Sequence, residues 1–155
     1  MCNLKIFLLS CFILFAGCKK MEDNNKVGVV DGQEYVITTN TEYLEYEWSK
    51  ILKDNKLDGK LLKFEIKKDF DTNEIPREYY FLVSYSSDMM IKVATEIIKK
   101  GNVFYFSNTK EQRIVVCHGT KDCMPKKFKD GNWGCDSSAD NLFECKKTEV
   151  IVTNK

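Results

Sequence analysis

The chain has 155 residues, which is enough for one domain with its own hydrophobic core and short for two. Its 24 basic and 23 acidic side chains nearly cancel. This balance excludes the clustered basic excess of nucleic-acid-binding proteins, so we expect no nucleic-acid partner.

The first segment of the chain has the layout of a bacterial export signal. Lys5 is followed by an apolar run over residues 6–16 that only Ser10 interrupts, and charge resumes at Lys19. A basic start, a short apolar core and small residues before a cleavage point are typical of a secretory signal. The run of 11 residues is far below the ~20 that a membrane-spanning helix needs, so no transmembrane anchor is expected.

Residues Phe15-Ala16-Gly17-Cys18 resemble a lipobox, at which bacteria attach diacylglycerol to the cysteine and cleave before it. The resemblance implies that residues 1–17 are removed as a signal peptide and that Cys18 is acylated, with the lipid bilayer as partner. An ordinary secretory signal with a cysteine nearby is the alternative. Inner-membrane retention signals carry Asp at the position of Lys19, so we expect the protein in the outer membrane. Whether it faces the periplasm or the cell surface is left undecided by the sequence.

A tether and then a hairpin are expected next. Residues 18–26 are polar and charged without apolar periodicity, and they predict a flexible tether. Removal of 17 residues from 155 leaves 138, with 23 basic and 23 acidic side chains because the removed segment holds one Lys and no acid. In residues 27–38, apolar runs flank Asp31-Gly32, which predicts a short hairpin.

Residues 39–53 have the apolar period of a helix. The stripe expected to be buried consists of Leu44, Trp48, Ile51 and Leu52. Thr39 with Glu42 fits a capping box at the start, and Asn55 and Asp58-Gly59 end the segment. A single helix of this length is marginal alone, so it must pack on a sheet.

The following segments alternate between apolar and polar residues, as half-buried strands do. The alternating positions are Leu62, Phe64 and Ile66, then Tyr79, Phe81, Val83 and Tyr85, then Ile91, Val93, Thr95 and Ile97, then Phe104 and Phe106. Residues 91–100 could form a helix instead, but the Gly101-Asn102 turn and the β-branched residues favour a strand. A two-residue loop containing Gly101 places Ile97 and Phe104 on the same face of the sheet.

Two further strands, over residues 113–117 and 148–153, complete the expected set. We therefore expect an α+β fold. An antiparallel β-meander over residues 27–116 carries one packed helix, and a C-terminal β extension over residues 117–155 belongs to the same domain. Turn residues dominate this extension, so disulfides are expected to pin it.

Seven cysteines are present, but Cys2 and Cys11 leave with the signal and Cys18 carries the lipid. The remaining four are Cys117, Cys123, Cys135 and Cys145. An exported chain leaves the reducing cytosol, so two disulfides are expected. The alternative is a zinc site with His118 as a further ligand, but the spacings C-x5-C and C-x9-C lack the tight clamp of structural zinc sites.

Four cysteines allow three pairings. We slightly prefer Cys117–Cys123 with Cys135–Cys145. If Asn141 lies near the tip of a hairpin, Cys135 and Cys145 are nearly opposite, within the ~4.4–6.8 Å between Cα atoms that a disulfide spans.

The extension also has a family resemblance. Its pattern reads Cys117-x5-Cys123-Met124-Pro125-Lys126, then Asn132-Trp133-Gly134-Cys135, then Cys145-Lys146-Lys147-Thr148. This pattern resembles the cysteine-rich C-termini of small Bacteroidota lipoproteins of unknown function, over about a quarter of the chain. The resemblance implies a location in the cell envelope and supplies no catalytic residue.

No complete catalytic motif is visible. His118 is the only histidine and lies beside an expected disulfide, and Ser84 has no G-x-S-x-G context, so no triad is predicted. Asp136 and Asp140 bracket a loop and could form a carboxylate pair of the glycosidase type, although nothing fixes their separation.

Asp69-x-Asp71-x-Asn73 imitates the start of a calcium loop. Glu74 replaces the required glycine and Tyr80 replaces the acid at the twelfth position, so a polar turn is favoured and no metal is expected. Trp133 lies among turn residues where burial is hard to arrange, which makes it the one candidate for ligand contact.

These features predict a lipid-anchored envelope protein that acts as a non-enzymatic binding or structural module, without a cofactor and with its protein or glycan partner open. One alternative is a small hydrolase of envelope polymers that uses Asp and Glu residues. Another is an inhibitor or immunity protein that presents a disulfide-held loop. A deep polar pocket holding several acids would favour the hydrolase, and a flat or convex surface would favour the binding module.

Overall fold

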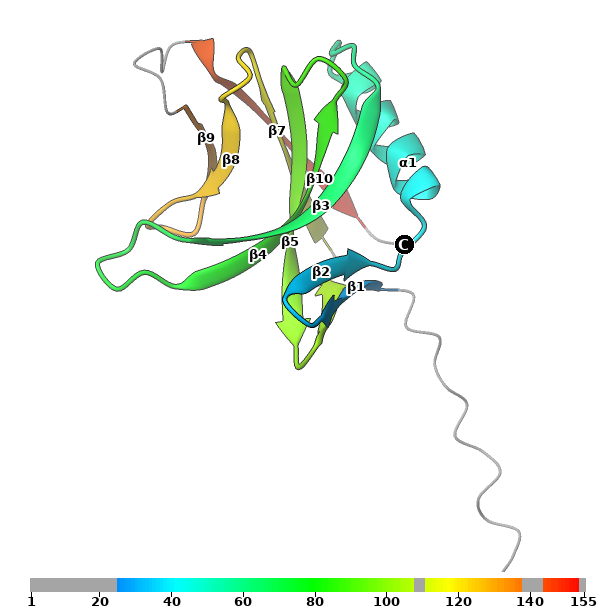
Figure 1. Cartoon of the computed structure of the whole chain (residues 1–155). Helices are drawn as coiled ribbons and strands as arrows, with labels where there is room; N and C mark the ends of the chain where they lie inside the picture. Colours follow the sequence, from blue (N-terminus) through cyan, green and yellow to red (C-terminus); the bar gives the residue numbers. More distant parts are fainter. Residues whose placement is uncertain (1–24, 108–110, 138–143, 154–155) are drawn as a thin grey trace, which may run out of the picture.

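The computed structural model describes residues 25–107, 111–137 and 144–153, which fold as an α+β domain (Figure 1). The signal peptide, Cys18 and most of the expected tether lie outside these residues. One helix, α1 (Thr41–Asp54), accompanies a large antiparallel sheet. The strands of this sheet are β1 (Lys26–Asp31), β2 (Glu34–Ile37), β3 (Leu61–Phe70), β4 (Glu78–Ser86), β5 (Ile91–Lys100), β6 (Val103–Phe106), β7 (Glu111–His118) and β10 (Lys146–Thr153). A separate hairpin consists of β8 (Met124–Lys127) and β9 (Trp133–Asp136).

The predicted hairpin at the start of the domain is present as β1 and β2. Gly32 lies in its turn with a φ of +60°, which glycine adopts without strain. β1 begins at Lys26, the last residue of the expected tether, and pairs with β6 on its other edge. A Cβ at Gly28 would lie 2.4 Å from the Val36 carbonyl oxygen, so this close approach of backbone requires glycine.

The predicted helix is present, but its N-cap differs from the prediction. Asn40 Oδ1 accepts a hydrogen bond from Tyr43 N at 3.0 Å, so Asn40 caps α1 and the capping box of Thr39 with Glu42 is wrong. The cause is that Thr39 N donates to Val27 O at 3.1 Å, which holds Thr39 against β1. The buried positions of the helix are Leu44, Trp48 and Leu52, with Ile51 partly buried, as the stripe predicted.

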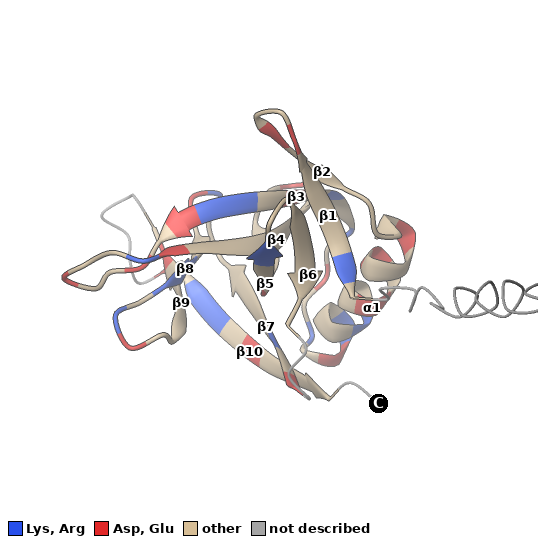
Figure 2. Cartoon of the chain, turned by 90° about the horizontal axis from the view of Figure 1, so that it is seen from below, with Lys and Arg blue, Asp and Glu red and all other residues tan. Residues whose placement is uncertain are grey.

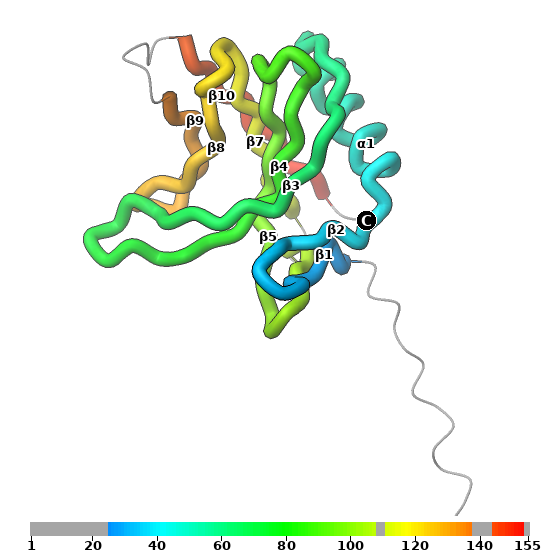
Figure 3. The backbone as a smooth tube through the Cα atoms, viewed as in Figure 1, coloured from blue at the N-terminus to red at the C-terminus, as the bar shows by residue number. Residues whose placement is uncertain are grey.

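β5 is the central strand of the sheet, and residues 91–100 are confirmed as a strand. One edge of β5 pairs with β4. Its other edge pairs with β7 in the first half and with β6 in the second half. β6 continues to β1 and β2, and β7 continues to β10. β3 and β4 curve together away from the end of β5 and extend as an arm (Figure 3).

The alternation of β3 is interrupted near its start. The register of β3 against β4 shifts between Leu61 and Lys63, so Leu61 is buried and Leu62 is 60% exposed. The prediction that Leu62 shares the buried face of Phe64 and Ile66 is therefore wrong, because a β-bulge reverses the direction of the side chains that precede it.

The sheet has a hydrophobic core on each face. The first core lies under α1 and the β1–β2 hairpin, and it contains both Ile97 and Phe104, which confirms that these two residues share a face. The second core lies between the sheet and the β8–β9 hairpin. Its buried members are Tyr79, Phe81, Val83, Tyr85, Ala94, Val115, Cys117, Cys123 and Trp133. β4 contributes to both cores, which explains its nearly continuous burial.

Two disulfides pin the C-terminal extension, as predicted, but the preferred pairing is wrong. The bonds are Cys117–Cys135 and Cys123–Cys145, with Cα atoms 5.6 and 5.4 Å apart. The chain turns back between β8 and β9, and this places Cys135 of β9 over Cys117 of β7. Asn141, the expected hairpin tip, lies outside the described residues.

Candidate functional site

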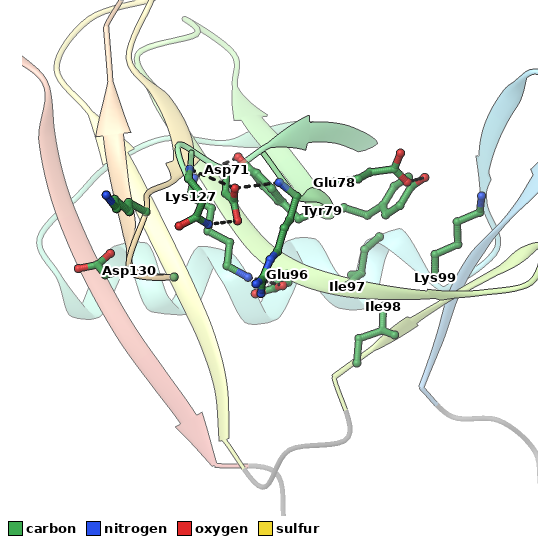
Figure 4. A pocket seen from close by; sticks show the side chains of 14 residues that line it. Asp71, Glu78, Tyr79, Glu96, Ile97, Ile98, Lys99, Lys127 and Asp130 are labelled. Atoms are coloured by element: carbon green, nitrogen blue, oxygen red, sulfur yellow. Dashed lines mark hydrogen bonds and ion pairs between the residues drawn. The ribbon is translucent and has the colours of Figure 1, made fainter. Parts of the chain in front are cut away.

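A cleft of about 640 Å³ opens where β4 and β5 diverge (Figure 4). The β4–β5 ladder ends at the pair Tyr80–Ile97, although β4 continues along β3 and β5 continues along β6. Three segments line the cleft: the β3–β4 loop and the start of β4, the end of β5, and the turn of the β8–β9 hairpin. Its volume lies within the roughly 300–1,000 Å³ of small-molecule sites.

The β3–β4 loop is held in shape by Asp71. One of its carboxylate oxygens accepts hydrogen bonds from Arg77 N at 2.9 Å and from Asn73 N at 3.3 Å, and Asp71 N donates to Arg77 O at 3.0 Å. The bond from Arg77 N is the main reason that the pKa of Asp71 lies below its usual range. Asp69 accepts from Phe70 N instead. The calcium-like sequence therefore forms a polar turn, with Asp71 hydrogen-bonded to its own loop.

Tyr79 joins two walls of the cleft. Its hydroxyl donates to Asp69 Oδ2 at 3.3 Å and accepts from Lys127 N at 3.1 Å. Burial raises the pKa of Tyr79 above its usual value, so the hydroxyl stays neutral and can make both bonds. Lys127 Nζ pairs with Glu96 of β5 at 2.7 Å. The hairpin turn is thus attached to both β4 and β5.

Each of the four acids that line the cleft already has partners. Asp71 is bonded to its loop, Glu96 to Lys127, Asp130 accepts from Asn132 N at 3.0 Å, and Glu78 binds Lys68 and the Tyr80 hydroxyl. The bonds from Lys68 and Tyr80 lower the pKa of Glu78. The bonds from Asn132 lower the pKa of Asp130. Asp71, Glu78 and Asp130 are therefore held as carboxylates.

Two of the four basic residues that line the cleft are ion-paired with acids, and the other two are not. Lys127 is paired with Glu96, and Lys129 lies 3.7 Å from Glu74. Lys99 Nζ lies 5.5 Å from the centre of the Tyr80 ring, and Arg77 also lines the cleft. Neither the Arg77 guanidinium nor Lys99 Nζ makes a hydrogen bond or ion pair within residues 25–107, 111–137 and 144–153. The charge of Lys99 helps to lower the pKa of Glu78, and that of Arg77 the pKa of Asp71. Arg77 and Lys99 are thus the two lining cations without an ion pair in the described part of the chain.

Trp133 does not occupy the exposed position that the sequence suggested. It is 4% exposed, and its ring meets those of Tyr79 and Phe81 edge-on, with centroids 5.5 and 5.7 Å apart. The expectation failed because β9 folds onto the sheet and supplies the apolar surroundings that a loop would lack. Trp133 is also among the residues that line a second cavity of about 230 Å³, with Glu96 and Arg113, and its role in ligand contact stays a prediction.

The other candidate residues do not meet in the cleft. His118 is half-buried at the end of β7, where burial and then Lys146 lower its pKa, so the ring is neutral near pH 7. Ser84 is fully buried. Asp136 binds Lys126 at 3.2 Å, while its proposed partner Asp140 lies outside the described residues, as does Cys18.

Only some of the residues of this cleft could be identified from the sequence. Asp69-x-Asp71-x-Asn73 and the neighbouring tyrosines marked one wall. The Asp130-Gly131-Asn132 turn was visible, but β8 and β9 were not predicted beside it, so the residues of that turn could not be placed in the site.

Charges of both signs are distributed along α1, β3 and β10 (Figure 2). Within the described part of the chain, no helix has both the length and the apolar composition that crossing a bilayer requires. Comparison with protein-family models, curated proteins and solved structures gives no match. The site is therefore interpreted from its own chemistry.

Proposed function

We propose that the protein is a lipid-anchored module of the bacterial cell envelope that binds a carboxylate-bearing ligand in the cleft and performs no chemistry on it. The lipobox-like sequence ending at Cys18 supports the anchor. The two cations without hydrogen-bonded partners, Arg77 and Lys99, support the ligand chemistry. An Arg guanidinium matches a carboxylate with two parallel hydrogen bonds, which gives both affinity and orientation.

The anchor keeps the domain beside the membrane. Six residues lie between Cys18 and Asn25, where the described domain begins, and the seven steps from one Cα atom to the next reach at most about 25 Å in a fully extended chain. A domain of this size has a radius of gyration of about 14 Å. The cleft is thus presented to ligands that lie within the envelope layer next to the bilayer, such as envelope polymers and their fragments.

The cleft is lined by several acids, the feature expected of a hydrolase, but the state of these acids favours binding over hydrolysis. A glycosidase needs one carboxyl group with a raised pKa to protonate the leaving group. Asp71, Glu78 and Asp130 instead have lowered pKa values and engaged oxygens, and Glu96 is ion-paired with Lys127. A hydrolase would have to break these contacts, whereas a binding module uses them to fix the walls of the cleft.

The proposal is tested by calorimetric titration with two acidic probes, an oligouronate and an acidic tetrapeptide, each beside its neutral counterpart. We expect an acidic probe to bind and its neutral counterpart not to bind. Arg77→Gln should weaken binding by about tenfold or more, since a hydrogen bond to a charged group contributes about 1.5–3 kcal/mol. Preference for one probe identifies the source of the carboxylate as a sugar or a peptide.

Arg113→Gln is the matched control, because Arg113 is ion-paired with Glu149 at 2.9 Å and lies outside this cleft. Its binding should equal that of the unmodified protein. The proposal is contradicted if neither acidic probe binds, if Arg77→Gln binds as well as the control, or if the bound probe is cleaved.

A further inference from the structure

The two disulfides of the extension bring sulfur atoms from four separate segments together. Cys117 lies on β7, Cys135 on β9, Cys123 in the β7–β8 loop and Cys145 just before β10. The Sγ atoms of Cys117, Cys123 and Cys135 all lie within 4.8 Å of one another, although they belong to two different disulfides. Cys117 and Cys123 are fully buried, so the cluster is part of the second core.

Two lysines flank this sulfur cluster. Lys92 of β5 and Lys147 of β10 are the register partners of Cys117 on its two neighbouring strands. Residues directly opposite on adjacent strands point to the same face of a sheet, so both side chains share the face of Cys117. Lys147 Nζ donates to the carbonyl oxygen of Trp133 at 2.8 Å, and Lys92 Nζ donates to that of Thr120 at 3.0 Å. Lys147 Nζ is also ion-paired with Glu149 Oε2 at 2.9 Å, so Lys92 is the cation on this face that favours thiolates.

We propose that the reduced form of this cluster is a Zn²⁺ site with Cys117, Cys123, Cys135 and Cys145 as ligands. A zinc–thiolate bond is about 2.3 Å long, which places tetrahedral sulfur ligands roughly 3.8 Å apart. The Sγ atom of Cys123 needs to approach those of Cys117 and Cys135 by at most about 1 Å to reach this spacing. The two sulfur atoms of each former disulfide move apart to the same spacing once reduction has broken their bond. Cys145 starts next to the cluster because it is bonded to Cys123.

Reduction and metal binding are separate steps. With a phosphine as reductant, each disulfide takes up two electrons and two protons, and the phosphine gains an oxygen atom from water and becomes the phosphine oxide. Four thiols result. Zn²⁺ then replaces the thiol protons, which pass to solvent, and Lys92 offsets part of the negative charge of the zinc–thiolate centre.

His118 is not a ligand in this proposal, although the sequence placed it beside Cys117. Consecutive side chains on a strand point to opposite faces, so His118 faces away from the cluster that Cys117 joins. The packing of the β8–β9 hairpin against the sheet brings together cysteines that lie far apart in the sequence. It makes up for the close sequence spacing that C-x5-C and C-x9-C lack.

The experiment is an anaerobic Co²⁺ titration, followed by Zn²⁺ displacement, on the phosphine-reduced full chain. The background chain carries Cys2→Ser, Cys11→Ser and Cys18→Ser, so that only the four cluster cysteines remain. We expect the visible bands of tetrahedral Co²⁺ and a near-ultraviolet thiolate charge-transfer band, saturating at one ion per chain and removed by Zn²⁺. Tryptophan fluorescence should stay that of buried indoles after metal loading, because Trp48 and Trp133 are both buried and Trp133 packs in the same core as the sulfur atoms.

Variants distinguish a specific metal site from nonspecific metal binding by free thiols. Cys117→Ser or Cys135→Ser should weaken Co²⁺ binding by more than about 100-fold, beyond the cost of changing an outer-shell residue. The matched control His118→Ala should bind as the background chain does. The proposal is overturned if the reduced chain binds no stoichiometric metal, if the cysteine variants bind as tightly as the control, or if the loaded chain exposes Trp133 to solvent.

Discussion

Lys92 is a fully buried lysine in the middle of the sheet. Its Nζ donates to the carbonyl oxygens of Thr120 and Lys121 and so attaches the β7–β8 loop to β5. Burial lowers the pKa of Lys92, while Asp122 and then Asp88 act in the opposite direction. The side chain serves the fold by satisfying two backbone acceptors of a loop that also carries Cys123.

We predict that Lys92→Met destabilises the oxidised protein by about 1–3 kcal/mol. The substitution keeps the volume of the side chain but removes its hydrogen bonds to Thr120 O and Lys121 O, and each hydrogen bond contributes about 0.5–1.5 kcal/mol net. Denaturant unfolding measures the change. Lys63→Met is the control, because Lys63 is 70% exposed and should change stability by no more than ~0.5 kcal/mol. Equal stability of the two variants would refute this role for Lys92.

The β8–β9 hairpin is the element on which the second core depends. Within the described residues its ladder is separate from that of the large sheet. The hairpin is held by its disulfide to β7, by Trp133 against Tyr79 and Phe81, and by the bond from Lys127 N to the Tyr79 hydroxyl. Since this hairpin also forms a wall of the cleft, loosening it affects the proposed binding site.

Removal of the second disulfide by Cys123→Ala with Cys145→Ala is expected to lower stability by about 3 kcal/mol, the chain-entropy value for a sequence separation of 22 residues. Amide hydrogen exchange should quicken first in β8 and β9, because packing holds α1 and the meander independently. Exchange that quickens equally in α1 would show that the extension and the body unfold as one unit, contrary to this prediction.

Helices and strands whose apolar residues recur at a regular spacing could be predicted from the sequence, and the other elements could not. The stripe of α1 and the alternation of β4 and β5 follow directly from burial on one or both faces. β8 and β9 have four residues each and include Pro125 and Gly134, so they carry no period to detect. The bulge at Leu61 and the disulfide pairing depend on contacts between distant segments, which local patterns do not contain.

At the scale of the whole molecule, the cleft combines residues that are more than 50 positions apart in the sequence, from Asp71 to Gly131. Its existence depends on the divergence of β4 from β5 and on the hairpin that folds back over the sheet. The polar residues of each wall can be seen in the sequence, but the sequence does not show that these segments lie side by side in the fold. The proposed anchor, in contrast, rests on local sequence alone, within residues 1–20.

The central claim is that this domain is held at a membrane by lipid on Cys18, and mass spectrometry of the N-terminal peptide from isolated membranes tests it most directly. We predict that residues 1–17 are absent and that the peptide begins with Cys18 carrying a diacylglyceryl group. Cys18→Ala should leave the protein in the soluble fraction. An unmodified Cys18, or a Cys18→Ala protein that stays with the membrane, would contradict the claim.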